Sequence, residues 1–366
     1  MKICFVVEDI YPTLSSPKGI VKPNGRAIIL KNIGRGLSNM GYDISYITMD
    51  YGQPEAEKVD GFTIYKLHRP NEGIPGLRFL LKKVPKLLRA LKKADADIYA
   101  FACPDSFVGI ISRFCRRKNK KFVFLGMSDK DFESEIHDIS LRDLHLFKYG
   151  LRNSDLVVCQ NDYQLQCLKK NYNKNGVILY TPMDSAEYTY DPTGSIIWVG
   201  NYRPVKRPEM FIELSKKIND KFIMIGGKAG DCAEQEYRHI NSSATNDNIN
   251  ILGSLDYDET DRLISRAKLL VNTSESEGFS ATFLQAWRRG IPVVSFVDPD
   301  DVIKKNNLGR VVHGFNELIS AVNDLRKGIS PEDSKKIKDF FDRTFTTNII
   351  AAKFDKLLKV DHGRNY

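Results

Sequence analysis

The sequence has 366 residues, 42% of them hydrophobic, with a formal net charge of +9 and a pI of about 9.0. This length predicts two domains of ordinary size, each with enough apolar residues for a core. No apolar run is long enough to cross a membrane. The six cysteines form neither Cys-x-x-Cys pairs nor the spacing of a zinc site. The chain is basic, but it contains no nucleic-acid-binding motif. The first residues, MKICFVVEDIYP, are too few and too acidic for a signal peptide, so we expect a cytosolic protein with reduced, buried thiols.

Strands and helices alternate from the first residues onward, which predicts α/β layers with parallel sheets. A strand over residues 2–7 is followed by a long loop at 11–25, a helix from about 27 to 39 and a second strand at 44–48. The long loop leaves the carboxyl end of the first strand, where open α/β sheets bind ligands. Further strands are predicted at 97–102, 121–126 and 155–159, and a helix at 162–171.

Residues 76–93, GLRFLLKKVPKLLRALKK, form a basic amphipathic segment in which Pro85 either kinks a helix or marks its start. Two interpretations remain open: a core-facing helix with a solvated basic back, or a surface that docks on anionic lipid. In the second, each cation near the membrane contributes about 1 kcal/mol. The apolar face would hold Leu77, Leu80, Leu81, Val84, Leu87, Leu88 and Leu91, and the basic face Lys82, Lys86, Arg89 and Lys93.

The composition turns polar, with Pro and Gly, from about residue 185 to 194, which predicts a linker. A second α/β series then starts with a strand at Ser195, and the next loop, NYRPVKRP at 201–208, crowds three cations beside the strand end. A solvated loop would also explain these cations, but a diphosphate bound at a strand end would need them there. Further predictions are helices at 208–217 and 258–267, strands at 222–225 and 249–252, and closing helices at 331–359.

Residues 271–296, VNTSESEGFSATFLQAWRRGIPVVSF, have the pattern of a strand, a polar loop, a helix at 279–289 and another strand. The free N–H groups and the dipole at the start of such a helix form a phosphate-sized anion site, and Gly278 lets a ligand approach the backbone. Glu277 would repel a bare phosphate but suits the hydroxyls of a sugar. The pattern therefore favours a ligand with both parts, as a nucleotide sugar has.

This segment resembles the donor-site signature of the retaining family-4 glycosyltransferases, which belong to glycosyltransferase group 1 and have the GT-B fold. Their pattern is Glu-Gly-Phe, a second Glu eight positions after the first, and then Gly-x-Pro-Val. The matching residues are Glu277, Gly278, Phe279, Gly290, Pro292 and Val293, whereas position 285 is Gln. The resemblance implies an α/β fold of two Rossmann-like, doubly wound domains facing across a cleft. The acceptor-binding domain would span 1–185 and the donor-binding domain 195–340, with a C-terminal helix at about 342–366 packing back on the first domain.

The resemblance also implies roles for individual residues. Glu277 would contact the transferred sugar, and Lys206 would grip the donor diphosphate. Arg203 is the candidate replacement for a family Arg, whose position is taken by Asn201. Gln285 can still hydrogen-bond the ribose, through its amide. The other expected contacts are Gly25 at the diphosphate, Gly253 and Leu255 at the base, Gly278 and the N–H groups of Phe279 and Ser280 at the phosphate, and Ser128 and Asp129 at the sugar or acceptor, where relatives place a His.

No metal and no cofactor are expected, because cations and a helix dipole would neutralise the diphosphate of the donor substrate, a UDP-sugar or GDP-sugar. The Asp-x-Asp sequences at 129–131 and 298–300 match the metal-binding pattern of GT-A glycosyltransferases, but this spacing arises often by chance and we discount both. His137 and His145 lie in a helix-like region and are expected to be structural.

The function that the resemblance implies is metal-independent hexosyl transfer, with retention of anomeric configuration, to a glycan or lipid-linked acceptor. The pathway would be cell-surface polysaccharide or glycolipid biosynthesis, in the cytoplasm or peripherally on the inner face of the membrane. Such enzymes are thought to use front-face attack, in which the departing diphosphate takes the acceptor proton. Three alternatives remain: an inverting GT-B enzyme, a non-catalytic sugar-nucleotide-binding subunit, and a basic nucleic-acid-binding protein. We do not expect a nucleic-acid partner.

Overall fold

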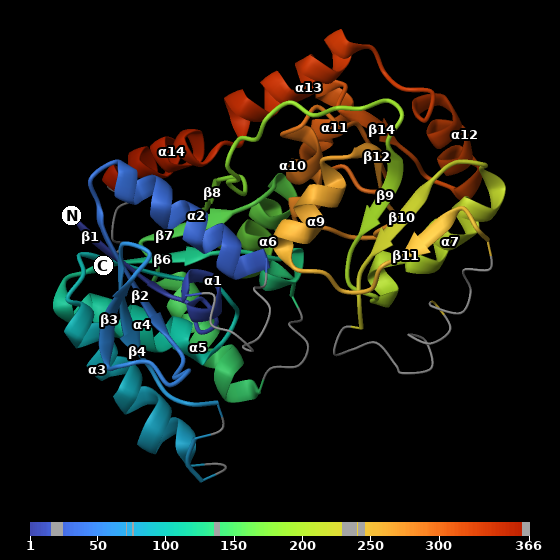
Figure 1. The fold of residues 1–366 in the computed structure, drawn as a ribbon. Helices are drawn as coiled ribbons and strands as arrows, with labels where there is room; N and C mark the ends of the chain where they lie inside the picture. Colours follow the sequence, from blue (N-terminus) through green and yellow to red (C-terminus); the bar gives the residue numbers. More distant parts are fainter. Residues whose placement is uncertain are drawn as a thin grey trace. The chain divides into compact units, whose positions relative to one another are not determined.

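The computed structural model describes residues 1–15, 25–70, 72–74, 77–134, 140–228, 240 and 246–360. The chain forms two compact units (Figure 1). Unit 1 consists of Met1–Pro182 together with Thr347–Tyr366, and unit 2 of Met183–Thr346.

Unit 1 is built on a sheet with the strand order β3-β4-β2-β1-β5-β6-β7-β8, in which β3 pairs antiparallel with β4 and the other neighbours are parallel. The order changes direction between β1 and β5. The central strands are buried along nearly their whole length, because helices cover both faces of the sheet. The strands are β1 (Lys2–Val6), β2 (Asp43–Thr48), β3 (Ala56–Val59), β4 (Phe62–Lys66), β5 (Ile98–Phe101), β6 (Lys121–Leu125), β7 (Leu156–Cys159) and β8 (Val177–Ile178).

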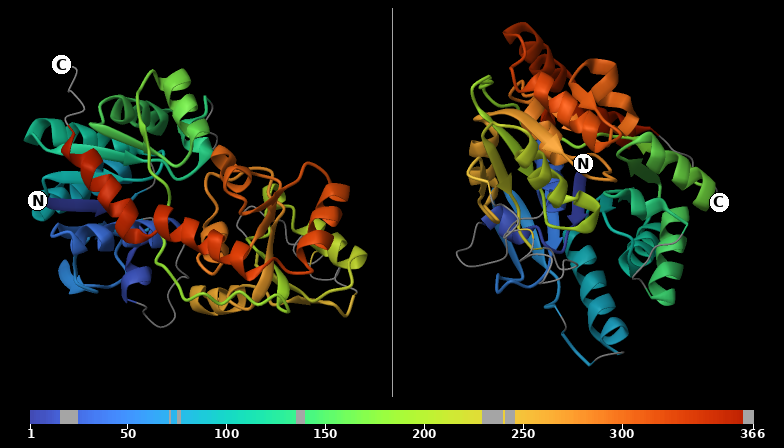
Figure 2. Two further views of the ribbon diagram at one scale, coloured as in Figure 1. Left: turned by 90° about the horizontal axis from the view of Figure 1, so that it is seen from above. Right: turned by 90° about the vertical axis from the view of Figure 1, so that its right-hand side faces the viewer.

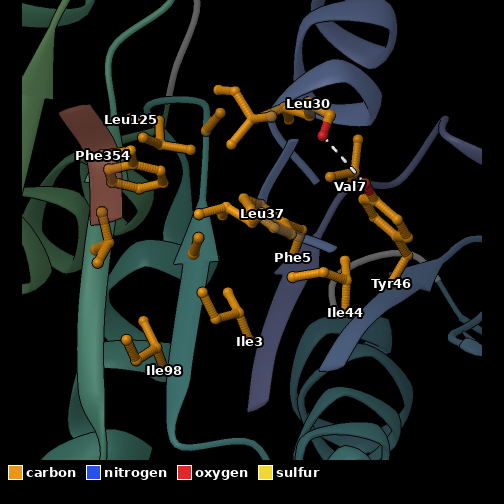
Figure 3. Close-up of a cluster of buried hydrophobic side chains, with 14 of the residues drawn as sticks. Ile3, Phe5, Val7, Leu30, Leu37, Ile44, Tyr46, Ile98, Leu125 and Phe354 are labelled. Atoms are coloured by element: carbon orange, nitrogen blue, oxygen red, sulfur yellow. Dashed lines mark hydrogen bonds between the residues drawn. The ribbon is translucent and has the colours of Figure 1, made fainter. Parts of the chain in front are cut away.

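Each face of this sheet has its own apolar core. On one face, Phe5 and Tyr46 pack with α2 (Gly25–Asn39) and α14 (Thr347–Lys359), as Figure 3 shows. On the other face, Tyr99 and Phe124 belong to a core that includes the buried sides of α3, α4, α5 and α6. The remaining helices of unit 1 are α1 (Tyr11–Ser15), α3 (Val84–Ala94), α4 (Ser106–Lys118), α5 (Leu141–Arg152) and α6 (Asp162–Tyr172), with a 3-10 turn η2 (Asp129–Phe132).

The C-terminal helix α14 packs against α2, which confirms the prediction that it returns to the N-terminal part of the chain. Gly36 makes this close approach feasible, since a Cβ there would lie 2.6 Å from the Cβ of Ala351. The Tyr42 hydroxyl donates to Asp355 Oδ1 over 2.5 Å and ties α14 to the start of β2.

The segment at 76–93 does not form the single leucine face that its spacing predicted. A π-helical turn, η1 (Phe79–Lys83), precedes α3, and the Val84 N–H donates to the carbonyl of Phe79, five residues back. The wider turn shifts the phase of the helix, so Leu87 and Leu91 are buried whereas Leu77, Leu80 and Leu81 are exposed. Figures 1 and 2 show the blue-green helix that contains this turn at the outer rim of unit 1.

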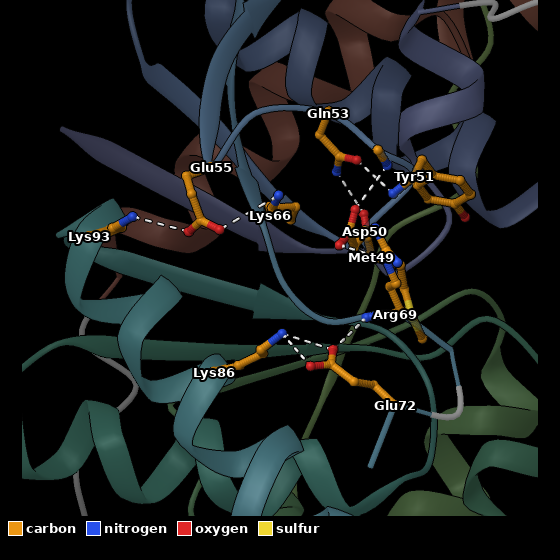
Figure 4. A network of polar contacts seen from close by, with 11 residues as sticks. Met49, Asp50, Tyr51, Gln53, Glu55, Lys66, Arg69, Glu72, Lys86 and Lys93 are labelled. Carbon is orange, nitrogen blue, oxygen red and sulfur yellow. Dashed lines mark hydrogen bonds and ion pairs between the residues drawn. The ribbon is translucent and has the colours of Figure 1, made fainter.

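Two cations of this segment, predicted to lie on a free basic face, have acidic partners. Lys86 Nζ lies 2.8 Å from both carboxylate oxygens of Glu72, and Lys93 Nζ lies 3.3 Å from Glu55, as Figure 4 shows. The two interpretations of 76–93 therefore apply to different parts of it: α3 is a core-facing helix, and the residues before it carry exposed leucines.

Helix α4 was not predicted, and α5 was predicted only as a helix-like region. The two helices pack backbone to backbone, because a Cβ at Gly109 would lie 2.4 Å from the carbonyl oxygen of Leu146 and one at Gly150 would lie 2.4 Å from the backbone of Val108. Because glycines make this contact, α4 and α5 carry fewer large apolar side chains at helical spacing. The periodic pattern from which other helices were predicted is therefore weaker in these two.

Unit 2 contains a second parallel sheet, with the order β11-β10-β9-β12-β13-β14. Successive strands run outward from β9 in one direction and from β12 in the other. Trp198, Phe211 and Phe222 are among the large side chains of its core. The strands are β9 (Ser195–Val199), β10 (Phe222–Ile225), β11 (Ile249–Ile251), β12 (Ala267–Asn272), β13 (Val293–Ser295) and β14 (Gly309–Val311). The helices are α7 (Pro208–Lys217), α9 (Tyr257–Ile264), α10 (Ala281–Trp287), α11 (Val302–Asn306), α12 (Phe315–Leu325) and α13 (Pro331–Thr344), with 3-10 turns η3 (Pro204–Lys206) and η4 (Pro299–Asp301).

Helix α10 is shorter than the predicted 279–289, because Phe279 is a packing residue before the helix rather than its first turn. The Phe279 ring lies 5.3 Å from the ring of Phe345 and 6.4 Å from that of Trp287. Among the described residues of both units, no helix combines the length and the apolar character that crossing a membrane requires.

Candidate functional site

The loops after β9 and β12 leave the sheet of unit 2 at the point where the strand order changes direction. In open α/β sheets, ligands bind beyond the carboxyl ends of the strands at this switch point, because the loops on its two sides diverge and leave a crevice. The predicted diphosphate loop, 201–208, and the polar loop before α10 are the two loops in question. The fold therefore places both predicted parts of the site side by side.

Hydrogen bonds join these two loops to each other. The Thr273 hydroxyl lies 2.6 Å from the carbonyl of Lys206 and 3.0 Å from that of Arg207, and it accepts from Trp198 Nε1 over 2.9 Å. The N–H of Glu275 donates to the carbonyl of Val205 over 2.9 Å. The two loops are thus held in a fixed arrangement before any ligand arrives.

Arg207 is a structural member of this arrangement. Its φ of 47° places it in the left-handed region between η3 and α7. Its Nε donates to the Thr273 carbonyl over 2.7 Å, and its guanidinium lies over the ring of Phe296, 4.4 Å from the centroid. Of the three cations in the loop, Arg207 is committed to holding the loop after β12.

Lys206 and Glu277 form an ion pair across the switch point, with Nζ 2.5 Å from Oε1. The same carboxylate oxygen accepts from Ser274 Oγ over 2.8 Å and from Asn272 Nδ2 over 3.2 Å. The Lys206 side chain is 26% exposed and that of Glu277 is 13% exposed, so both can be reached from solvent. The site therefore presents an ammonium and a carboxylate together, as a ligand with phosphate and hydroxyl groups requires.

Arg203 begins the turn that carries Lys206. It is the residue before η3, its N–H donates to the Asn201 carbonyl over 2.9 Å, and it is exposed. A second cation thus lies three residues from Lys206 in the same loop.

Glycines bring the ends of β9, β10 and β11 close together. A Cβ at Gly226 would lie 1.9 Å from the carbonyl oxygen of Gly200, and the Gly226 N–H donates to the Gly253 carbonyl over 2.9 Å. Gly253 has a φ of +70°, which glycine adopts without strain, and Leu255 follows it half-buried. The turn predicted to read the base therefore lies on the same sheet edge as Lys206.

Gln285 faces a buried charge network. Its Nε2 lies 3.4 Å from Asp261 Oδ1, and Asp261 also accepts from the guanidinium groups of Arg288 and Arg289. Burial, followed by the neighbouring Arg288, lowers the pKa of Arg289. Two arginines and one aspartate leave a positive excess beside position 285.

Residues 186–328, which make up most of unit 2, match the family described as "Glycosyl transferases group 1". Unit 2 therefore resembles the group 1 glycosyltransferases over most of its length. A curated relative, the uncharacterized glycosyltransferase MJ1178 of Methanocaldococcus jannaschii, is 24% identical over 298 residues, which are 78% of this chain and 79% of the relative.

Solved structures of glycosyltransferases share the fold of the whole chain. Sucrose-phosphate synthase from Thermosynechococcus elongatus has a TM-score of 0.73 at 16% identity, with 98% of each chain covered. TarM from S. aureus, in a complex that includes UDP, has a TM-score of 0.76 at 13% identity over 98% of this chain and 100% of that one. HepE from Anabaena, in complex with UDP-glucose, has a TM-score of 0.72 at 14% identity, covering 98% and 99%. These similarities and the two parallel sheets confirm the predicted GT-B fold.

Changes at Gln285 test whether position 285 takes part in nucleotide binding. Gln285→Glu is expected to preserve or raise nucleotide affinity, because the positive excess of Arg288 and Arg289 accommodates a second carboxylate beside Asp261. Gln285→Leu should lower the affinity by removing the amide. Calorimetric titration with the nucleoside diphosphate measures both, and normal binding by the leucine variant would place position 285 outside the site.

In unit 1 of the glycosyltransferase, the predicted pair Ser128 and Asp129 follows β6. Ser128 is exposed and caps η2, and its N–H donates to Asp131 Oδ2 over 3.1 Å. Asp129 Oδ1 accepts from Asn161 Nδ2 over 2.9 Å and from Gln164 Nε2 over 3.0 Å. Asp129 is therefore held in place by the start of α6.

Polar residues also gather at the switch point of unit 1, between β1 and β5. Arg26, the residue after Gly25, forms an ion pair of 2.8 Å with Asp9 after β1 and contacts the Cys103 thiol after β5. Gly25 begins α2, and a Cβ there would meet nothing within 4 Å. The long loop predicted at 11–25 is wrong at its described ends, since Tyr11–Ser15 form helix α1 and Gly25 begins α2, and residues 16–24 lie outside the described residues.

Neither Asp-x-Asp sequence arranges its aspartates as metal ligands. Asp298 accepts from the N–H groups of Ile303 and Lys304 at the start of α11, over 2.7 and 3.1 Å. Across the described ranges, no group of three His, Cys, Asp or Glu side chains could hold a metal ion. His145 Nδ1 lies 2.7 Å from the Leu141 carbonyl of its own helix, and His137 lies outside the described residues.

Two carboxyl groups at the strand ends of unit 1, those of Asp105 after β5 and Asp131 after β6, make the stability of this unit depend on pH. Burial raises the pKa of Asp105 to about 7 and that of Asp131 to about 6. When a carboxyl group has a higher pKa in the folded state than in the unfolded state, its ionisation lowers the free energy of unfolding. The stability of unit 1 should therefore be greatest below the unfolded pKa, near 4, and should fall as the pH rises through the folded pKa of about 7. Asp105→Asn keeps the cap that Asp105 Oδ1 supplies to the Phe107 N–H but does not ionise.

The variant Asp105→Asn should therefore flatten the loss of stability between pH 4 and 7. At pH 8 its free energy of unfolding should exceed that of the wild type by on the order of 3 kcal/mol. Urea unfolding at pH 5 and pH 8 measures this. Parallel pH profiles for the two proteins would show that Asp105 ionises normally in the folded state.

Several residues of the donor-side arrangement were not predicted. Asn272 and Ser274 hold Glu277, Thr273 joins the two loops, and Asp261 lies beside Gln285. Asn272, Thr273 and Ser274 could have been predicted from their position in the sequence. Polar residues that directly follow a buried strand lie at the ligand-binding edge of a parallel sheet. Asp261 has no such signal, because it lies on a separate helix, α9.

Proposed function

We propose that this glycosyltransferase moves a hexose from a UDP-sugar or GDP-sugar to a glycan or lipid-linked acceptor, with retention of anomeric configuration and without a metal ion. The observation that carries the proposal is the ion pair of Lys206 and Glu277 at the switch point of unit 2. It lies in the segment with the Glu-Gly-Phe and Gly-x-Pro-Val sequences of the retaining enzymes.

Lys206 is suited to serve both parts of the donor. An ammonium has three N–H donors, so it can keep one hydrogen bond to Glu277 and give others to diphosphate oxygens. As the bond between the sugar and the diphosphate breaks, negative charge grows on the leaving oxygen, and Lys206 and Arg203 stabilise it. The departing diphosphate then accepts the proton of the attacking acceptor hydroxyl.

Glu277 is proposed to orient the transferred sugar through its hydroxyls. Three neighbours fix the position of its carboxylate, and Oε1 is the oxygen that all three use, so Oε2 is available to a ligand. Gly278, Phe279 and Ser280 would bring backbone N–H groups to the phosphate side, and Gly253 with Leu255 would contact the base.

Of the two proposed donors, the UDP-sugar has more support than the GDP-sugar, because similar solved structures contain UDP. HepE is in complex with UDP-glucose, and TarM is in complex with UDP together with alpha-GlcNAc-glycerol. A thermal-shift comparison of UDP-, GDP- and ADP-sugars tests the donor class, and the anomeric configuration of the product, read by NMR, separates retention from inversion. The proposal predicts stabilisation by a UDP- or GDP-sugar and a product with the configuration of the donor.

The acceptor is proposed to bind unit 1, at the carboxyl edge that carries Ser128 and Asp129. Unit 1 has 33 Lys and Arg against 21 Asp and Glu, a net charge of +12, whereas unit 2 has 22 against 25, a net of −3. A basic acceptor unit fits an enzyme of polysaccharide or glycolipid biosynthesis that works in the cytoplasm, peripherally on the anionic inner face of the membrane through residues in 76–93.

One alternative has its own support. Gln285 replaces the family glutamate and hydrogen-bonds Asp261, which also suits a subunit that binds sugar nucleotides without transferring sugar. Release of free nucleoside diphosphate when acceptor is added to the protein with donor distinguishes the enzyme from such a subunit.

A further inference from the structure

Exposed aliphatic side chains gather at one place on unit 1. Among the described residues, the exposed leucines and isoleucines are Ile74, Leu77, Leu80, Leu81, Leu141 and Ile349. The first four lie in and just before the π-helical turn η1, with exposures of 67, 52, 67 and 63%. Leu141, 77% exposed, precedes Arg142, whose guanidinium lies over the ring of Phe79 at 3.9 Å from the centroid. We call Leu77, Leu80, Leu81 and Leu141, with the cations among them, the leucine patch.

The leucine patch lies at the carboxyl edge of the unit 1 sheet, the edge at which open α/β sheets generally bind ligands. It occupies the N-terminal ends of α3 and α5, and helices that cross between parallel strands start at the carboxyl edge of the sheet. Burial raises the pKa of Glu8 after β1 and that of Asp105 after β5, and the charge of Lys83 in η1 partly offsets this rise in both. Lys83 therefore lies near the carboxyl groups at the strand ends.

The charges of the leucine patch favour an anionic partner. Arg78, Lys82 and Lys83 lie among its leucines in the sequence, and Lys82 is exposed. Glu72, which precedes the patch, forms an ion pair with Lys86. A second copy of this chain would bring another unit of net charge +12 against the patch, so repulsion opposes a dimer formed through it.

We propose that the leucine patch docks on an anionic bilayer surface. The leucines enter the boundary between headgroups and acyl chains while the flanking cations lie among the headgroups. The carboxyl edge of the unit 1 sheet then faces the bilayer, and the acceptor is a lipid-linked sugar taken from it. The statement about the acceptor rests on the proposed function, whereas the docking itself does not.

The docking surface is narrower than the sequence indicated. Leu87 and Leu91 are in the core, and Lys86 and Lys93 already have carboxylate partners, so none of these four is needed for binding. Exposed leucines can be replaced without a cavity, which makes the patch testable in a folded protein.

Co-sedimentation of the full chain with vesicles tests the proposal. One set of vesicles is phosphatidylcholine with about 30% phosphatidylglycerol, and the other is phosphatidylcholine alone. The wild type should bind the first set and leave the second, and rising salt should weaken the binding. Leu77→Ser, Leu80→Ser and Leu81→Ser combined should lower the partition coefficient by roughly 100-fold, given the apolar area that three leucines bury. Arg78→Gln with Lys82→Gln should lower it by at least about 10-fold.

Two matched controls lie on the same unit but away from the patch. Met40→Ser removes an exposed apolar side chain at the end of α2. Arg117→Gln with Lys118→Gln removes two exposed cations at the C-terminal end of α4, whereas the leucine patch occupies the N-terminal ends of α3 and α5. Both should bind anionic vesicles as the wild type does. Circular dichroism and nucleotide affinity, measured without vesicles, should be the same for all variants.

Three results would overturn the proposal: a wild type that ignores anionic vesicles at low salt, patch variants that still bind, or control cations that matter as much as Arg78 and Lys82. Each would leave the proposed sugar transfer standing if the protein still binds its nucleotide sugar, and would remove only its proposed place on the membrane. Loss of nucleotide binding with intact docking would instead refute the proposed function and keep the docking surface.

Discussion

Replacing Lys206 with alanine is expected to lower kcat/KM by about 10²-fold or more, the scale for losing a charge partner of a transition state. In the structure its Nζ lies 2.5 Å from Glu277 Oε1, at the switch point between β9 and β12. In the proposed mechanism, its removal takes a cation from the leaving diphosphate and leaves Glu277 without its ion-pair partner. Both effects raise the barrier, so kcat should fall together with kcat/KM.

Lys216→Ala is the matched control for this experiment. Lys216 also forms an ion pair, with Glu213 at 2.6 Å, but on the exposed side of α7. Its removal should leave the kinetics unchanged and alter stability by less than about 1 kcal/mol. If Lys206→Ala turned over like this control, Lys206 would not act on the donor.

Replacing Glu277 with alanine is expected to abolish transfer and to cost stability as well. The sequence shows no partner for this carboxylate, but the structure gives it three, Lys206, Ser274 and Asn272. Leaving these donors without their acceptor should lower the free energy of unfolding by about 1–3 kcal/mol. Steady-state assays and urea unfolding measure the two effects separately.

Glu277→Gln separates the charge from the hydrogen bonds. The amide oxygen can still accept from Ser274 and Asn272, so this variant should be more stable than Glu277→Ala while transfer stays at least about 10²-fold below the wild type. Near-normal turnover by either variant would show that Glu277 only holds the two loops together.

The fold could be predicted because its strands are short apolar runs buried on both faces. Runs such as IIWV at 196–199 and LLV at 269–271 lie between loops of Gly, Pro and polar residues, and each became a central strand of unit 2. The ordered motifs from Gly200 to Phe296 then located the candidate site. By contrast, α4 was not predicted and α5 was predicted only as a helix-like region, because glycines mediate their contact and glycine spacing carries little periodic signal.

The details of the site depend on contacts between distant residues. Nothing in the sequence near Arg207 indicates that its side chain hydrogen-bonds the carbonyl of Thr273, 66 positions away. In the same way, the π-helical turn before α3 alters which leucines face the core, since one wider turn rotates all later side chains relative to the earlier ones. A leucine spacing that assumes one helical period cannot show this.

The central claim is that Lys206 and Arg203 bind the diphosphate of a nucleotide-sugar donor in unit 2. Calorimetric titration of the wild type, Lys206→Ala and Arg203→Ala with a nucleoside diphosphate and the matching monophosphate tests it most directly. We expect each variant to lose most of its affinity for the diphosphate, while its affinity for the monophosphate falls much less. Equal losses for the two ligands, or unchanged affinity for both, would contradict it.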